Sequence, residues 1–123
     1  MKVATHDLDL TISLPVADRT AADDGAVVDL ADASGCGIFV FANAIAGTHS
    51  IAVQHSDADD AGFVDVAPDD LSGPLFNLSA NSRQKVSYIG VKRYVKAIST
   101  SAGGTGNFGV VIVRTLMRKL AVA

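Results

Sequence analysis

Residues 37–46 read Gly-Ile-Phe-Val-Phe-Ala-Asn-Ala-Ile-Ala, and residues 108–115 read Phe-Gly-Val-Val-Ile-Val-Arg-Thr. Both stretches are almost continuously apolar, and their β-branched and aromatic residues favour strands. A strand with one solvated face alternates apolar and polar residues, whereas a strand buried on both faces does not. The two stretches therefore predict central strands of a β-sandwich. The predicted core residues are Ile38, Val40, Val53, Val95, Val111 and Val113.

The N-terminal part of the chain shows the alternation expected of a strand with one buried face. Leucine or isoleucine occupies every second position from Leu8 to Leu14, and polar residues lie between them. Pro15 is expected to end or bend this strand. Residues 86–99 predict one long strand with a bend at Gly90, although Arg93 then falls on its apolar face.

Seven or eight short strands, with turn residues at roughly ten-residue spacing and almost no helix signal, predict an all-β fold. The chain of 123 residues has the length of one domain. We therefore expect a single-domain antiparallel β-sandwich of jelly-roll type over residues 1–123. Residues 1–7 and 116–123 are expected to form extended terminal arms, because no turn signal folds them back and unpartnered termini fray.

The composition excludes several classes of protein. Apolar residues make up 49% of the chain and charged residues 19%, which excludes a mainly disordered chain. The lone cysteine, Cys36, predicts neither an internal disulfide nor a cysteine-ligated metal site. Asp7 and Asp9 interrupt any N-terminal signal-peptide core, and the longest nearly apolar stretch, residues 35–47, is shorter than the roughly 20 residues of a membrane-spanning helix. These features predict a soluble protein that has no membrane partner.

Charge is sorted along the chain. Residues 1–82 hold all thirteen acids, every one an Asp, and only two bases, a net charge of −11. Residues 83–123 hold eight bases and no acid. Either the two halves interleave and neutralise each other across neighbouring strands, or they form separate patches that face opposite patches on neighbouring subunits. A nucleic-acid partner is not expected, because the acidic half would repel phosphate and stacking aromatics are few.

No residue pattern predicts catalysis, a cofactor or a metal. Asp57, Asp59 and Asp60 resemble the start of a calcium loop, but the chain has no Glu to close it. His49 and His55 are six residues apart on one strand face, about 20 Å from each other, too far to share a metal. The Gly-rich loop at 103–106 lacks the lysine of a phosphate-binding loop.

Two groups of motifs resemble those of a known family. Residues 81–96 read Asn-Ser-Arg-Gln-Lys-Val-Ser-Tyr-Ile-Gly-Val-Lys-Arg-Tyr-Val-Lys and precede a Gly/Thr loop and an apolar strand. Upstream, Gln-His-Ser-Asp at 54–57, Phe-Val-Asp-Val at 63–66 and Asp-Asp-Leu at 69–71 form a second run. From about Leu8 to Lys119 the chain resembles small virion proteins of tailed bacteriophages and prophages, whose motifs are structural and carry no catalytic role.

The resemblance implies a head or capsid-associated structural protein, a decoration or cement protein that reinforces the shell on the virion surface after synthesis in the host cytoplasm. Its implied partners are the major capsid protein and further copies of itself, as a dimer or trimer. A tail or neck component, or a carbohydrate- or receptor-binding module built around Tyr88 or Tyr94, is the alternative. The candidate interface residues are Lys92, Lys96, Leu116, Met117, Arg118, Lys119 and Leu120.

Overall fold

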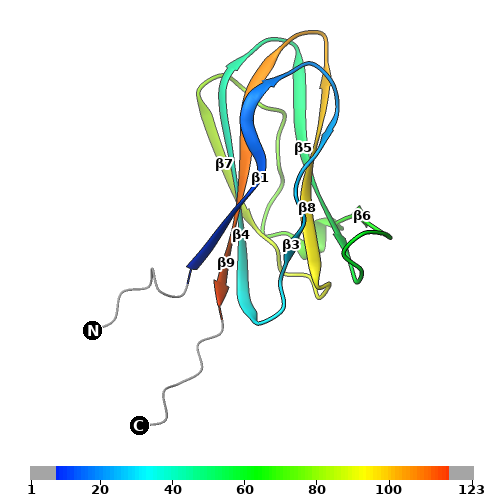
Figure 1. Cartoon of the computed structure of the whole chain (residues 1–123). Helices are drawn as coiled ribbons and strands as arrows, with labels where there is room; N and C mark the ends of the chain where they lie inside the picture. The colour runs from blue at the N-terminus through cyan, green and yellow to red at the C-terminus, as the bar shows by residue number, and fades with distance from the viewer. Residues whose placement is uncertain (1–7, 117–123) are drawn as a thin grey trace, which may run out of the picture.

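The computed structural model describes residues 8–116, which form two antiparallel sheets packed face to face (Figure 1). The predicted β-sandwich is confirmed. Sheet A has the strand order β1 (Leu8–Arg19), β9 (Gly106–Leu116), β4 (Ala33–Ile45) and β7 (Ser82–Ser87). Sheet B has the order β2 (Asp23–Asp24), β8 (Tyr94–Ala102), β5 (Thr48–Ser56) and β6 (Val64–Asp65), and β3 (Val28–Asp29) also pairs with β8.

The connectivity is that of a jelly roll. Most connections cross from one sheet to the other, so that β1 is followed by β2 and β3, β4 by β5, and β8 by β9 in facing layers. The β5–β6 hairpin and the 3-10 turn η2 (Pro68–Asp70) complete the edge from which the chain crosses back to β7. This double-sheet arrangement is one of the ways in which an all-β chain limits its exposed edges.

The core lies between the sheets, and most of the predicted core residues are there. Ile38, Val40, Val53 and Val95 are at most 3% exposed. The prediction was wrong for Val111 and Val113, which lie half-buried on the other side of β9. Phe108, Val110 and Ile112 fill the core from this strand instead. Because residues 108–113 contain no polar side chain, their sequence carries no information on which alternate set faces inward.

The first strand was also predicted with the wrong face buried. Leu14 is 1% exposed, but Leu8, Leu10 and Ile12 are 39%, 64% and 59% exposed. A register shift between Ile12 and Leu14 places two successive residues, Ser13 and Leu14, inside, as a β-bulge does. The strand does not end at Pro15 but continues to Arg19, since an edge strand tolerates a missing N–H.

The predicted long strand over residues 86–99 is two strands in different sheets. β7 ends at Ser87 in sheet A and β8 begins at Tyr94 in sheet B. The segment between them crosses the end of the sandwich, so Ile89 and Val91 are exposed and Arg93 turns outward to Asp29. The crossing explains why Arg93 did not fit the alternation of a continuous strand.

Candidate interaction surface

The side of sheet A that faces away from sheet B is apolar. Pairing aligns Ile12 with Val111, and Val111 with Phe39, in one row across the sheet. The neighbouring row contains Leu10 and Val113. We call this surface the outer face; its apolar residues are Leu8, Leu10, Ile12 and Val16 of β1, Val111 and Val113 of β9, and Phe39 and Phe41 of β4.

Two glycines let these side chains lie flat on the sheet. A Cβ at Gly37 would be 3.1 Å from a ring carbon of Phe39, so the ring covers that glycine. A Cβ at Gly109 would be 2.7 Å from Cγ2 of Val16, which therefore lies over the backbone of β9. The outer face is thus a layer of packed side chains, with Leu10, Ile12 and Val16 each more than half exposed.

Two unpaired bases border the outer face along β7. Arg83 pairs in register with Phe41, and Lys85 with Phe39. The guanidinium of Arg83 lies 5.4 Å from the centre of the Phe41 ring. Over residues 8–116, neither base has a carboxylate within ion-pair distance. At the same end of the sheet but on its opposite edge, Asp18 of β1 accepts a hydrogen bond from Asn107 at 2.9 Å.

The other bases of the described chain are paired with aspartates. Four pairs join the acidic half of the sequence to the basic half: Lys92 with Asp57, Arg93 with Asp29, Lys96 with Asp24, and Arg114 with Asp9. Arg19 pairs with Asp23. For these bases the acidic and basic halves neutralise each other within one subunit, as in the first of the two arrangements expected from the sequence. Most of the unpaired acids lie in the β5–β6 loop and around η2.

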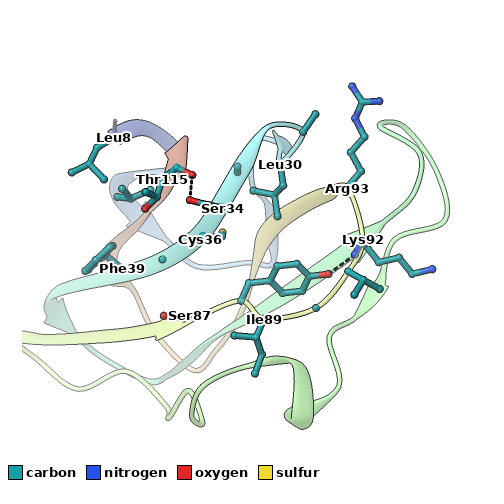
Figure 2. A pocket seen from close by; sticks show the side chains of 18 residues that line it. Leu8, Leu30, Ser34, Cys36, Phe39, Ser87, Ile89, Lys92, Arg93 and Thr115 are labelled. Carbon is teal, nitrogen blue, oxygen red and sulfur yellow. Dashed lines mark hydrogen bonds between the residues drawn. The ribbon is translucent and has the colours of Figure 1, made fainter. Parts of the chain in front are cut away.

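An open groove of about 780 Å³ continues from the outer face to the end of the sandwich. Leu8 and Phe39 line one side of it, and Ile89 and Lys92 line the other (Figure 2). Val91, also in its wall, is 94% exposed. The groove is therefore walled largely by apolar side chains of sheet A and of the β7–β8 crossing.

The polar groups beside this groove have structural partners. Burial raises the pKa of Tyr88, so its hydroxyl stays protonated. That hydroxyl accepts a hydrogen bond from the Lys92 amide at 3.0 Å and forms a second hydrogen bond with Nδ1 of His55 at 2.7 Å. Burial also raises the pKa of the Cys36 thiol to about 12, which leaves almost no thiolate for nucleophilic chemistry at neutral pH.

His49 is fully buried, and its ring forms two hydrogen bonds within the domain. Its Nε2 donates to the carbonyl of Ala46 at 2.6 Å, and its Nδ1 lies 2.8 Å from the hydroxyl of Ser101. Within residues 8–116, no three His, Cys or Asp side chains converge as metal ligands. In the same range, no helix has the length and apolar character needed to cross a membrane.

The candidate interface residues are distributed over several places. Lys92 donates to Asp57 at 2.9 Å, while Lys96 lies 3.8 Å from Asp24 and 4.6 Å from the ring centre of Phe63. Leu116, which pairs with Ala33, ends β9. Met117, Arg118, Lys119 and Leu120 lie outside the described residues, as do the expected arm at 1–7 and the rest of the C-terminal arm. Contact of any of these residues with a partner stays a prediction.

The sequence analysis did not predict the apolar outer face as an interaction surface. The signal that could have revealed it is an excess of apolar residues: β4 and β9 are apolar on both sides, and β1 adds a further apolar row. One core cannot accommodate all of them. No protein-family model matches the chain, and a search of curated proteins finds no significant match.

Proposed function

We propose that the chain is a non-enzymatic structural protein of a bacteriophage virion, a decoration or cement protein that binds the major capsid protein and stabilises the head shell through oligomeric contacts. The observation that carries the proposal is the apolar outer face of sheet A. Contiguous apolar surfaces of this kind mark contacts with other proteins. The resemblance of residues 54–71 and 81–96 to small phage virion proteins supplies the virion setting.

The internal bonding of the domain supports a contact role. Its buried histidines, its tyrosine hydroxyl at the groove and most of its described bases are engaged within the subunit. Side chains that are already held by bonds within the subunit lose little further conformational entropy on binding. The jelly roll itself supports the proposal only by analogy, because folds of this type serve many functions.

The alternative function, from a different functional class, is a carbohydrate-binding or receptor-binding module. An exposed aromatic platform at Tyr88 or Tyr94 would favour it. Tyr88 is 5% exposed and its hydroxyl is fully engaged. The guanidinium of Arg93 lies over the half-buried ring of Tyr94, 5.1 Å from its centre. Neither tyrosine therefore offers the flat, open ring on which a sugar would stack.

The test is to locate the full chain on intact particles by electron microscopy, and to add purified chain back to particles made without it. We expect density at regularly repeated positions on the outside of the head, saturable rebinding, and greater resistance of the decorated heads to heat. Density confined to the tail or neck would overturn the assignment to the head. A chain that is absent from particles and does not rebind to heads would overturn the virion role.

A further inference from the structure

We propose that the outer face of sheet A is covered by the outer face of a second copy of this chain, in a two-fold symmetric dimer with the two sheets packed face to face. The inference deepens the proposed function and rests on it for its setting in a particle. The contact itself is expected to form in solution without any shell.

The first argument is the composition of the two central strands of sheet A. β4 and β9 carry apolar side chains on both sides, a pattern typical of strands that are buried on both sides. In residues 8–116, sheet B covers only the inner side. A second sheet packed about 10 Å away would bury the outer side in the same way that sheet B buries the inner one.

The second argument is the distribution of charge on the outer face. Its centre, made by Phe39, Phe41, Val111 and Val113, is free of charge, and its charged residues lie at the edges. An apolar centre within a polar rim is the anatomy of a protein interface, and homodimer interfaces are the more apolar kind. Two-fold pairing also uses the face of each copy once, so this face is not left open for a third copy to extend a filament.

The same charges select the direction of the two-fold axis. An axis along the strands places β1 of one copy over β7 of the other. Asp18, at the corner of β1, then approaches Arg83 near the corresponding end of the partner's β7, twice in each dimer. An axis across the strands would instead place β7 over β7 and bring Lys85 against its own copy, where like charges repel.

The size of the outer face approaches that of a standard protein interface. Four strands about 4.8 Å apart, over about eight residues at about 3.3 Å each, outline roughly 500 Å² in projection. Side chains raise the accessible area of such a surface above its projection. That brings it toward the about 800 Å² that each partner buries in an interface of standard size.

The first experiment measures the mass of the full chain in solution by sedimentation velocity over a range of concentrations. We expect twice the monomer mass of 12.6 kDa. The double variant Leu10→Glu/Ile12→Glu should sediment as a monomer with an unchanged circular dichroism spectrum, because both side chains already face outward. The matched control is Val64→Glu, a similarly exposed position in sheet B, which should remain dimeric.

A cross-linking experiment identifies the face. The native Cys36 is buried, so a cysteine introduced at the surface reacts selectively. A short bis-maleimide should join two copies of the Val111→Cys variant, but neither the native chain nor the Val64→Cys variant.

A native chain that is monomeric at every concentration overturns the proposal, and so does a dimer that survives Leu10→Glu/Ile12→Glu. If the Val111→Cys variant is monomeric and its introduced thiol still does not react with maleimide, the chain's own ends cover the outer face. That result also overturns the proposed dimer. If the chain is monomeric but still decorates particles, the proposed function holds and the dimer is wrong. If the chain is dimeric but absent from particles, the dimer holds and the proposed function is wrong.

Discussion

The ion pair between Asp29 and Arg93 shows how one residue that looked misplaced in the sequence contributes to the fold. Two guanidinium nitrogens of Arg93 donate to the two carboxylate oxygens of Asp29, each at 2.9 Å, and the amide of Ala31 donates a third hydrogen bond. The bonds from Arg93, then the bond from Ala31, lower the pKa of Asp29 from 3.8 to about 2. The pair ties the start of the β3–β4 connection to the end of the β7–β8 crossing.

This pKa shift predicts a measurable acid sensitivity. A carboxylate with a lowered folded-state pKa stabilises the fold fully above its ordinary pKa of 3.8 and loses this contribution as the pH falls toward about 2. Asp29→Asn should therefore lower the stability to urea at pH 6 and flatten its decline between pH 4 and pH 2. Because the pair is half exposed, solvent screening keeps the effect small. Asp59→Asn, in the β5–β6 loop, is the control, and an identical acid profile for native chain and Asp29→Asn would contradict the prediction.

The second prediction at this scale concerns His49. His49→Leu keeps the approximate size of the side chain but leaves the Ala46 carbonyl and the Ser101 hydroxyl without their ring partner. Each buried polar group that loses its hydrogen bond costs about 1–3 kcal/mol. Because Ala46 is exposed and Ser101 half-buried, water compensates in part, and urea denaturation should show a total loss in that range. Gln54→Ala, on the solvated side of the same strand, should cost much less, and a His49→Leu variant as stable as the native chain would show that these bonds contribute nothing.

At the scale of elements, alternate residues of β9 have two different roles, one set in the core and the other on the outer face. The sequence of the strand does not distinguish the two sets. Ile112→Ala removes a fully buried side chain and should cost about 2–5 kcal/mol, from lost transfer free energy and a residual cavity. Val113→Ala, one position along, lies on the outer face and should cost far less in the isolated domain. Chemical denaturation at low protein concentration, where any dimer dissociates, provides the comparison. Equal losses at the two positions would mean that the outer face is as well packed as the core.

Strand β1 shows why some of the outcome could not be read from the sequence. The alternation of Leu8, Leu10 and Ile12 correctly predicts a strand, but alternation alone assigns the apolar set to a core. The bulge at Ser13 decides the phase, and it is fixed by tertiary contacts. The Ser13 hydroxyl donates to the Ala26 carbonyl at 2.9 Å and accepts from the Ala97 amide at 3.1 Å. These partners are distant in the sequence, so no local pattern encodes them.

At the scale of the whole molecule, the sequence predicts the fold class but not the apolar outer face. Nearly continuous apolar stretches and frequent turns predict a sandwich, because such strands bury an apolar side against a second sheet, and the jelly-roll order of the two sheets confirms it. The Gly-rich loop at 103–106 connects two strands, since β8 runs to Ala102 and β9 begins at Gly106. The outer face depends on which alternate residues point outward, a property of strand register and of the β1 bulge rather than of composition.

The charge pattern of the whole molecule leads to the last prediction. Intrasubunit pairs engage Lys92 and Lys96, whereas Arg83 and Lys85 have no acidic partner in residues 8–116. Free charges at the rim of an interface act mainly on the association rate. We expect Arg83→Glu/Lys85→Glu to slow the association of two copies of the chain and to weaken the salt dependence of that rate, with little change in dissociation.

The matched variant, Lys92→Glu/Lys96→Glu, makes the same change in net charge but removes two internal pairs and places each new carboxylate beside an aspartate. It should lower the stability of the folded domain more than the first variant does. Both association rates are measured at 0.1 M and 1 M salt, between which the Debye length falls from about 10 Å to about 3 Å. If Lys92→Glu/Lys96→Glu alone slows association, those two lysines form the contact that the sequence predicted. If the rate responds neither to salt nor to either reversal, the opposite charges of this chain act only within the subunit.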